Sequence, residues 1–192
     1  ETKGGLVSID LQVDRHGDAA AATVEMGIAT FKPDALPCSL NVPELIQQPI
    51  EAGGRSLIFT GVSVGNPHCV VFKPTGESWS REDLLALGPA LEHHKLFPKR
   101  TNVQLVVPTG RNEVFILIWE RGAGETQASG SSSCAAASAA VRLGLVKSPV
   151  TVKMPGGVLN IDVAPDFSLT MKGPVAEVAR GTLSPSFIRG LK

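Results

Sequence analysis

The sequence lacks an excess of charge of either sign, and this absence excludes several classes of protein. Its 192 residues carry 18 lysines and arginines against 18 aspartates and glutamates, which gives a formal net charge of zero. A neutral chain releases few counterions from a phosphate backbone, so we expect no nucleic-acid partner bound mainly by charge. With 43% hydrophobic and 19% charged residues, the chain is also not an acidic disordered tail.

Long apolar runs and paired cysteines are absent as well. The clearest apolar run, residues 114–119, is far shorter than the ~18 to 20 residues of a bilayer span, so we expect a soluble protein with no membrane partner. Three widely spaced cysteines, Cys38, Cys69 and Cys134, form no CxxC pair, which indicates a reducing cytoplasm. No set of His, Cys, Asp and Glu residues has metal-ligand spacing, so no metal is expected.

The length fits one large domain or one domain plus a fragment. The chain opens with Glu1 and without a signal peptide, which predicts a truncated or processed piece of a longer polypeptide. A linker rich in proline around Pro33 interrupts the pattern of strands. We therefore place a domain boundary near this residue.

The apolar patterning indicates an α+β fold dominated by sheet. Period-2 alternation predicts a half-buried strand over residues 7–13, and residues 22–28 form the returning strand. Further strands are expected at residues 55–64, 69–72, 103–107, 113–119, 150–153, 158–163, 167–171 and 175–179. Residues 103–107 and 113–119, joined by a short polar turn, make the clearest hairpin.

Two segments have helical signals. Ser80 and Asp83 are spaced as a capping box variant, which predicts a helix start, and Pro89 predicts two short helical pieces there rather than one long helix. Residues 134–143, half of which are alanine, predict a second helix that ends at Gly144. Because small residues occupy every face of it, this helix must be buried in a tight space.

The loop of glycine and serine that precedes the alanine helix is the best candidate for a site. Free backbone N–H groups at a helix N-terminus can bind an anion, although a flexible linker with a helix cap is the commoner explanation of such a run. Arg121 can grip a carboxylate at the mouth of this loop, and Glu120 can hold an ammonium group or orient a base. A solvated pair at the rim is the plainer alternative for these two residues.

Four motifs together resemble the diaminopimelate epimerase family. They are residues 65–70 (GNPHCV), residues 91–103 (LEHHKLFPKRTNV), residues 120–128 (ERGAGETQA) and residues 154–157 (MPGG). Their order and spacing correspond to the last part of the family's first half and to all of its second half. The family's initial segment, with its own Cys-Gly-Asn motif, is absent from the sequence.

The resemblance implies a cofactor-independent amino-acid epimerase built from two pseudo-symmetric half-domains, each a curved, mostly antiparallel sheet wrapped round a central helix. One cysteine thiolate removes the α-proton of LL-diaminopimelate, and a cysteine of the other half returns a proton to the opposite face, giving meso-diaminopimelate for lysine biosynthesis. Residues 1–32 are then a remnant of the N-terminal half-domain, residues 33–181 the C-terminal half-domain, and residues 182–192 a tail that packs back toward the first half. A homodimer, or the missing N-terminal segment, is the expected protein partner.

The resemblance also implies roles for individual residues. Contacts with the small amino-acid substrate are implied for Asn66, Asn102, Glu120 and Arg121. Hydrogen bonds from backbone N–H groups to its α-carboxylate are implied for Gly130 and Ser131. Proton transfer is implied for His68 and Glu120, together with the residue at the catalytic position, which is Ser129.

Ser129 departs from the family, which has cysteine at this position. A thiol with a pKa of ~8.5 yields thiolate in an electropositive pocket, whereas a serine hydroxyl titrates far higher and needs a strong partner to act as the base. Cys134 cannot replace it, because five helical residues turn a side chain by about 140°, and we interpret Cys134 and Cys69 as packing residues.

Ser132 and Ser133 also differ from the family's usual Gly-Ala pair. Several differences together favour natural divergence over an engineered exchange of cysteine for serine. Three functions stay open: an epimerase with altered base chemistry, a relative that acts on another amino acid or catalyses another isomerisation, and an amino-acid-binding module without turnover.

Overall fold

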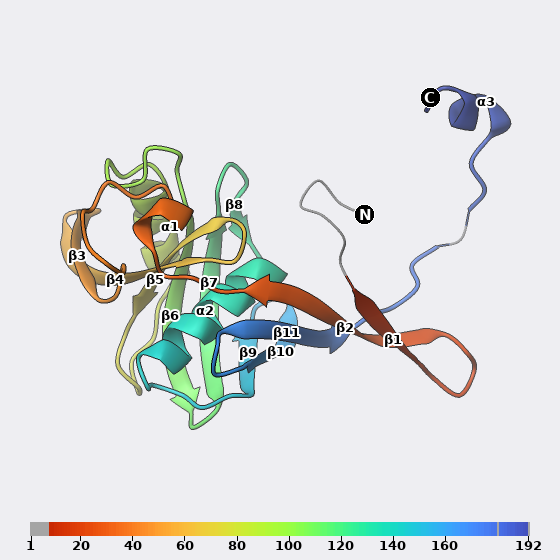
Figure 1. Cartoon of the computed structure of the whole chain (residues 1–192), viewed down its shortest axis with the longest axis horizontal. Coiled ribbons are helices and arrows are strands. Elements are labelled where there is room, and N and C mark those ends of the chain that lie inside the picture. Colours follow the sequence, from red (N-terminus) through yellow and green to blue (C-terminus); the bar gives the residue numbers. More distant parts are fainter. Residues whose placement is uncertain (1–7, 180, 192) are drawn as a thin grey trace.

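The computed structural model describes residues 8–179 and 181–191, which form one mixed, mostly antiparallel sheet folded around a helix (Figure 1). The order of the strands in this described part is β1-β2-β11-β10-β9-β7-β6-β5-β4-β3, with β8 paired to β7 off this path. The strands are β1 (Ile9–Val13), β2 (Ala19–Ile28), β3 (Gln48–Ala52), β4 (Arg55–Ser63), β5 (Pro67–Phe72), β6 (Asn102–Gly110), β7 (Glu113–Glu120), β8 (Gly124–Thr126), β9 (Val150–Met154), β10 (Gly157–Val163) and β11 (Ser168–Pro174). The helices are the 3-10 helix η1 (Pro33–Ala35), α1 (Arg81–Glu92), α2 (Gly130–Arg142) and α3 (Pro185–Arg189).

Two strand pairs, β5 with β6 and β7 with β9, are parallel. A parallel pair needs a crossover connection, and these two are supplied by α1 and by α2. The two helices lie on opposite faces of the sheet: Val106 of β6 belongs to the core around α2, whereas its neighbour Leu105 belongs to the core around α1. This architecture confirms the predicted α+β class, with a mostly antiparallel sheet wrapped round a central helix.

The central helix α2 is buried from Ser132 to Ala140, which confirms the prediction from its small residues. It begins at Gly130 rather than at the expected Cys134, because the serines before Cys134 find hydrogen-bond partners inside the fold. At its other end Gly144 has a φ of +70° and donates to the carbonyl of Val141, which confirms it as the terminating residue.

The prediction of two short helical pieces around Pro89 is wrong, because α1 is a single helix. Pro89 lies in the last turn and removes the hydrogen bond that the carbonyl of Leu85 would accept. Leu85 is exposed, so water can satisfy that carbonyl. The start at Ser80 is confirmed, since its hydroxyl accepts from the Asp83 amide and the Asp83 carboxylate accepts from the Ser80 amide in a full capping box.

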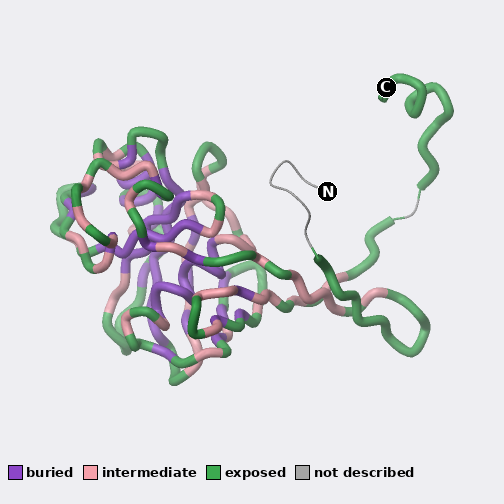
Figure 2. The backbone as a smooth tube through the Cα atoms, in the orientation of Figure 1, coloured by how far each residue is buried: buried purple, intermediate pink, exposed green. Residues whose placement is uncertain are grey.

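The hairpin of β1 and β2 projects from the body of the molecule, and so does the C-terminal segment with α3 (Figure 1). All five residues of β1 are exposed, including Leu11 at 62%, so the prediction of a half-buried strand is wrong in the described structure, and Val7 lies outside the described residues. β1 pairs only with β2 at the edge of the sheet, and no second layer of the described chain covers it. Figure 2 shows the same contrast between the exposed hairpin and tail and the buried body.

Other predicted strands are confirmed with shifts of a few residues at their ends, with one exception. The strand predicted over residues 175–179 is wrong, because the sheet ends at Pro174 and these residues form no strand. Two short strands, β3 and β8, were not predicted. Among the described helices, none is long and apolar enough to cross a membrane.

Candidate functional site

The predicted site residues lie together where the ends of four neighbouring strands, β4 to β7, lie side by side. We call this row of strand ends the site edge of the sheet. The parallel strands β5 and β6 both begin there, with His68 opposite Asn102 in the register. Their antiparallel neighbours β4 and β7 end there, with Ser63 opposite Pro67 and Trp119 opposite Val103. Residues far apart in the sequence, from the turn after β4 to the end of β7, therefore lie at the site edge.

Asn66 joins this edge to the start of α2. Its Nδ2 donates to Oγ of Ser131 at 3.5 Å, and its Oδ1 lies 2.9 Å from Nε2 of His68. Asn66 and Ser131 are half-buried, so a ligand can still reach both side chains. The contact brings the GNPH motif and the start of the alanine helix together, and their shared role in binding stays a prediction.

His68 is fully buried, although it follows an exposed turn in which a histidine could equally lie at the surface. Burial lowers the pKa of the His68 imidazole to about 3, with an opposing effect of Gln104 and a further lowering by the charge of Arg121. The ring is therefore neutral near pH 7, and Asn66 connects it to the site. Among the described residues, Nδ1 of His68 and Oε1 of Gln104 lack hydrogen-bond partners, although Gln104 is close enough to affect the imidazole.

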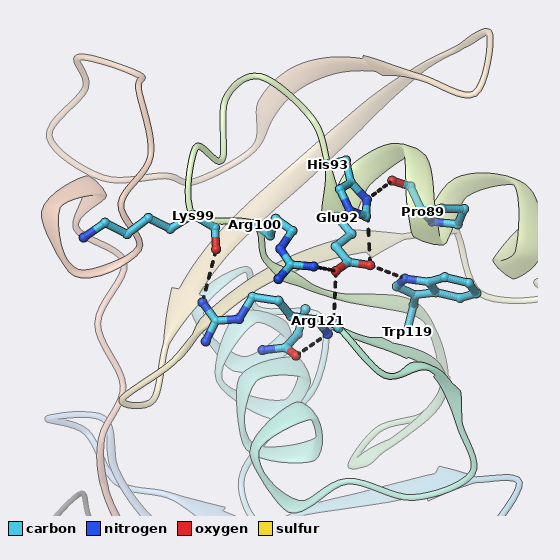
Figure 3. A network of polar contacts seen from close by, with 9 residues as sticks. Pro89, Glu92, His93, Lys99, Arg100, Trp119 and Arg121 are labelled. Carbon is cyan, nitrogen blue, oxygen red and sulfur yellow. Dashed lines mark hydrogen bonds and ion pairs between the residues drawn. The ribbon is translucent and has the colours of Figure 1, made fainter.

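Arg121 begins the turn after β7, and its backbone is held by Asn102. Oδ1 of Asn102 accepts from the Arg121 amide at 2.9 Å, while Nδ2 of Asn102 donates to the carbonyl of Pro67 at 2.9 Å. The Arg121 guanidinium donates to the carbonyl of Lys99 at 3.3 Å and is otherwise exposed (Figure 3). Asn102 thus fixes the backbone of the turn through hydrogen bonds from inside the sheet. The remaining N–H groups of the Arg121 guanidinium are exposed and can bind a ligand.

Ser129 precedes the first turn of α2 and has an extended backbone conformation. Its side chain makes no capping hydrogen bond to the described helix, so the first amides of α2 are left for a ligand. The Ser129 carbonyl accepts from the Ser133 hydroxyl at 2.8 Å, and Gln104 donates to the Ser132 hydroxyl at 3.0 Å. Side-chain hydrogen bonds of Ser133 and Gln104 therefore hold the start of the helix.

A hollow of about 280 Å³ lies beside Ser129 and Gly130. Its other wall includes Gly156 and Gly157 of the MPGG motif, and the Gly156 amide donates to the carbonyl of Gln127 at 2.7 Å. A Cβ on Gly156 would lie 2.7 Å from that carbonyl oxygen, so the close approach requires glycine. The MPGG turn therefore supports the loop that leads to Ser129.

The cysteines do not take part in this site. Cys69 and Cys134 are fully buried, and burial raises the pKa of the Cys134 thiol to about 12, which confirms that both are packing residues. The described residues contain no group of three His, Cys, Asp or Glu side chains that could hold a metal ion.

Two residues at the site were missed. Gln104 follows Asn102 on the same face of β6 and contacts both the helix start and the His68 region. Glu92 reaches the Arg121 turn from the end of α1 and lies in the LEHHKLFPKRTNV motif, which was the only signal for it. The roles of the predicted site residues in binding and proton transfer stay predictions.

Comparison with known proteins places these features in a family. A model of diaminopimelate epimerase matches residues 60–178. A diaminopimelate epimerase of Synechococcus sp. (strain JA-3-3Ab) is 44% identical over 163 residues, which are 83% of this chain and 57% of the relative. Another, from Desulfitobacterium hafniense (strain DSM 10664 / DCB-2), is 37% identical over 184 residues, which are 95% of this chain and 63% of the relative. The chain spans about three fifths of the length of these relatives.

Solved structures with the same fold have lower identity. A hydroxyproline epimerase from Agrobacterium vitis superposes with a TM-score of 0.62 at 14% identity, over 91% of this chain and 55% of that one. A predicted epimerase from Pseudomonas aeruginosa gives a TM-score of 0.57 at 22% identity, over 92% of this chain and 63% of that one. At these identities the likeness shows the fold alone, and it confirms the fold that the motifs implied.

Proposed function

The chain belongs to the diaminopimelate epimerase family, and from this membership we propose that it forms the C-terminal, substrate-binding part of an amino-acid epimerase. The reaction is the cofactor-independent interconversion of LL- and meso-diaminopimelate for lysine biosynthesis. The observation that carries the proposal is the meeting of Asn66, the Arg121 turn and the first turn of α2 at the site edge. These groups suit a ligand with an α-carboxylate.

The chemistry follows from the charges at this edge. Removal of an α-proton places negative charge beside a carboxylate, and fixed N–H dipoles stabilise such charge without rearranging. Gly130 and Ser131 supply those dipoles at the start of α2, and Arg121 supplies a positive charge nearby. Glu120, at the end of β7, is the partner for the substrate ammonium group.

Ser129 supports a second candidate function, amino-acid binding without turnover. Its hydroxyl is a much weaker acid than the thiol found in the family, and in the described part of the chain it makes no capping hydrogen bond to α2. Cys134 does not compensate, because its thiol is buried within the helix. An isomerase that uses another base, or acts on another amino acid, is the remaining alternative.

We further propose that the exposed hairpin and tail belong to the interface with the N-terminal half-domain. Exposed apolar side chains are found on β1 and on the C-terminal segment, namely Ile9, Leu11, Val13, Leu183, Phe187, Ile188 and Leu191. Clusters of exposed apolar side chains on each of these segments are typical of a surface that another protein layer covers. Addition of the N-terminal two fifths of the Desulfitobacterium relative should protect the backbone amides of β1 from exchange, and unchanged exchange would contradict the assignment.

Binding of meso-diaminopimelate to the chain, followed by calorimetry or by NMR, tests the main proposal. We expect binding that Arg121→Ala weakens by about tenfold, since a charge-assisted hydrogen bond contributes about 1.5 to 3 kcal/mol. Arg111→Ala is the matched control, because Arg111 is an exposed arginine in the turn at the opposite end of β7. Equal binding by both variants would remove Arg121 from the site.

Exchange of the α-proton in deuterated water separates the candidate functions. Deuterium at Cα identifies an isomerase, whereas tight binding without exchange identifies a binding module. Histidine and other amino acids serve as competing ligands. Failure of every amino acid to bind would contradict both functions for this chain.

A further inference from the structure

Glu92 holds both flanks of the segment that carries Glu120 and Arg121. Its Oε2 accepts from the indole Nε1 of Trp119 at 2.8 Å, and its Oε1 accepts from the amide of Gly122 at 2.8 Å. Trp119 directly precedes Glu120, and Gly122 directly follows Arg121. One carboxylate therefore brackets the two residues to which the proposed function assigns the charged contacts with substrate. Figure 3 shows the bond from Trp119 to Glu92 and the position of Arg121 beside them.

The same carboxylate also reaches the loop before β6. Oε1 of Glu92 lies 3.3 Å from Nη1 of Arg100. The neighbouring Lys99 carbonyl accepts from the Arg121 guanidinium, and Asn102 in the next strand accepts from the Arg121 amide. Glu92 thus ties the Trp119–Gly122 segment to the loop whose Lys99 carbonyl contacts Arg121.

The negative charge of Glu92 destabilises helix α1 at the place where it lies. Glu92 is the last residue of α1, where the carbonyl ends of the helix disfavour a negative charge. It is also only 3% exposed, and a buried charge is unfavourable unless it is paired and hydrogen-bonded. Burial raises the pKa of Glu92, but the bonds from Trp119 and Gly122 and the charges of His93 and Arg100 lower it below its usual value overall. The group is ionised at neutral pH.

We propose that Glu92 is a positioning residue that sets the Trp119–Gly122 segment and thereby aims Arg121 at the substrate carboxylate. The expected effect on substrate binding rests on the proposed function. The placement of the turn rests only on the contacts of Glu92. A carboxylate is needed because it accepts hydrogen bonds on both oxygens at once, from Trp119 on one side and from Gly122 on the other. An amide offers only one acceptor atom.

Glu92→Gln and Glu92→Ala test the placement by NMR. The chain has two tryptophans, so the indole N–H region of a ¹H–¹⁵N spectrum contains two signals, and Trp79→Phe assigns them. In Glu92→Gln we expect the Trp119 indole to shift and the Gly122 amide to exchange about tenfold faster, because a hydrogen bond to a charged group is lost or weakened. The Trp79 indole, which donates to the Val106 carbonyl, and the Leu105 amide in β6 should not change. Glu92→Ala should have the larger effect.

Binding of meso-diaminopimelate tests the consequence. If Glu92 acts through Arg121, Glu92→Gln weakens binding about tenfold, and adding Glu92→Gln to Arg121→Ala weakens it no further. Glu44→Gln is the matched control, because Glu44 pairs with Arg142 at 2.6 Å on another surface. It should leave binding and the Gly122 amide unchanged.

Each outcome decides the inference. Unchanged Trp119 and Gly122 signals in Glu92→Gln overturn it, and so does faster exchange across the whole sheet, which would make Glu92 a general brace of the fold. Additive losses in the double variant also overturn it, because Glu92 would then act independently of Arg121. If the unmodified chain binds no diaminopimelate, the proposed function fails, while the NMR measurement still decides whether Glu92 sets the turn.

Discussion

Nδ2 of Asn66 lies 3.5 Å from Oγ of Ser131, although 65 positions separate the two residues in the chain. Because Oδ1 of the same amide lies 2.9 Å from Nε2 of His68, Asn66 bridges a buried neutral imidazole and the start of α2. A ligand bound at the helix N-terminus, as we propose, would meet an amide whose orientation depends on His68. The protonation state of His68 therefore affects the orientation of Asn66 in the site as well as the stability of the core.

His68 should make the stability of the fold depend on pH. Burial lowers its pKa to about 3 in the folded chain, whereas the unfolded group titrates near 6.5, so between these values the unfolded chain binds the extra proton. The contribution of His68 is present above pH ~6.5 and is lost as the pH falls toward 3, with a slope of up to about 1.4 kcal/mol per pH unit.

Urea unfolding of the chain and of His68→Gln between pH 5 and 7.5 measures this effect. The interval stays above the usual pKa of the carboxylates, including Glu92, so their titration contributes little. The variant should show a shallower dependence on pH, and the slope that remains includes that of His94, whose pKa burial also lowers. Identical slopes for the two proteins would show that His68 is not buried in its neutral form.

The alanines of α2 should not tolerate larger side chains. Ala136 and Ala140 are fully buried between the helix and the sheet, so Ala136→Leu or Ala140→Leu should destabilise the fold by about 1 to 3 kcal/mol through overpacking. Ala86→Leu is the matched control, because Ala86 is an exposed alanine in α1. Chemical denaturation measures all three, and an unchanged midpoint for both buried variants would contradict the packing described above.

Local patterns were sufficient to predict the elements whose environment is uniform. The β6–β7 hairpin and the alanine helix were predicted because each has one dominant signal, apolar strand patterning in the first and small residues on every face in the second. The exposure of β1 was not predictable in this way, since the alternation of Ile9, Leu11 and Val13 indicates an apolar face but does not say whether another layer covers it. Burial is a property of the assembled layers.

The site shows the same division. Asn66, Arg121 and the helix start could be recognised from motifs, but the full burial of His68 follows from the parallel pairing of β5 with β6, which no local pattern specifies. Gln104 contacts the start of α2 from a strand interior, and Glu92 contacts the Arg121 turn from the end of a helix on the opposite face. Their side-chain chemistry is ordinary in the sequence and becomes informative only once their partners are known.

Gly88 should be essential for the packing of Trp119. A Cβ at this position would lie 2.5 Å from the Trp119 ring, so Gly88→Ala must displace the indole and with it the bond to Glu92. We expect a loss of about 1 to 3 kcal/mol of stability, as for other overpacked cores, together with a change in tryptophan fluorescence. Gly110→Ala is the control, since its Cβ would meet only Glu113 at 3.5 Å. Equal stability of the two variants would contradict the close approach.

Ser129→Cys should introduce proton exchange at Cα without inversion of diaminopimelate. A thiol at this position lies before the first turn of α2, where the helix N-terminus favours the thiolate, so it can remove and return a proton on one face of the substrate. Inversion also needs a group on the other face, and the family's first cysteine belongs to the Cys-Gly-Asn motif that the 192-residue sequence does not contain. Because catalytic groups that act as a unit fail together, repair of one of two positions should recover little epimerisation.

Incubation of Ser129→Cys with LL- and with meso-diaminopimelate in deuterated water checks this. Mass spectrometry follows deuterium at Cα, and chiral chromatography follows the stereoisomers. Ser129→Ala should show neither change, and Arg121→Ala added to Ser129→Cys should slow the exchange, because the carboxylate is then held less firmly. Inverted product from the single chain would show that both faces of the substrate are served by residues 1–192, and the argument for a second half-domain in the reaction would fail.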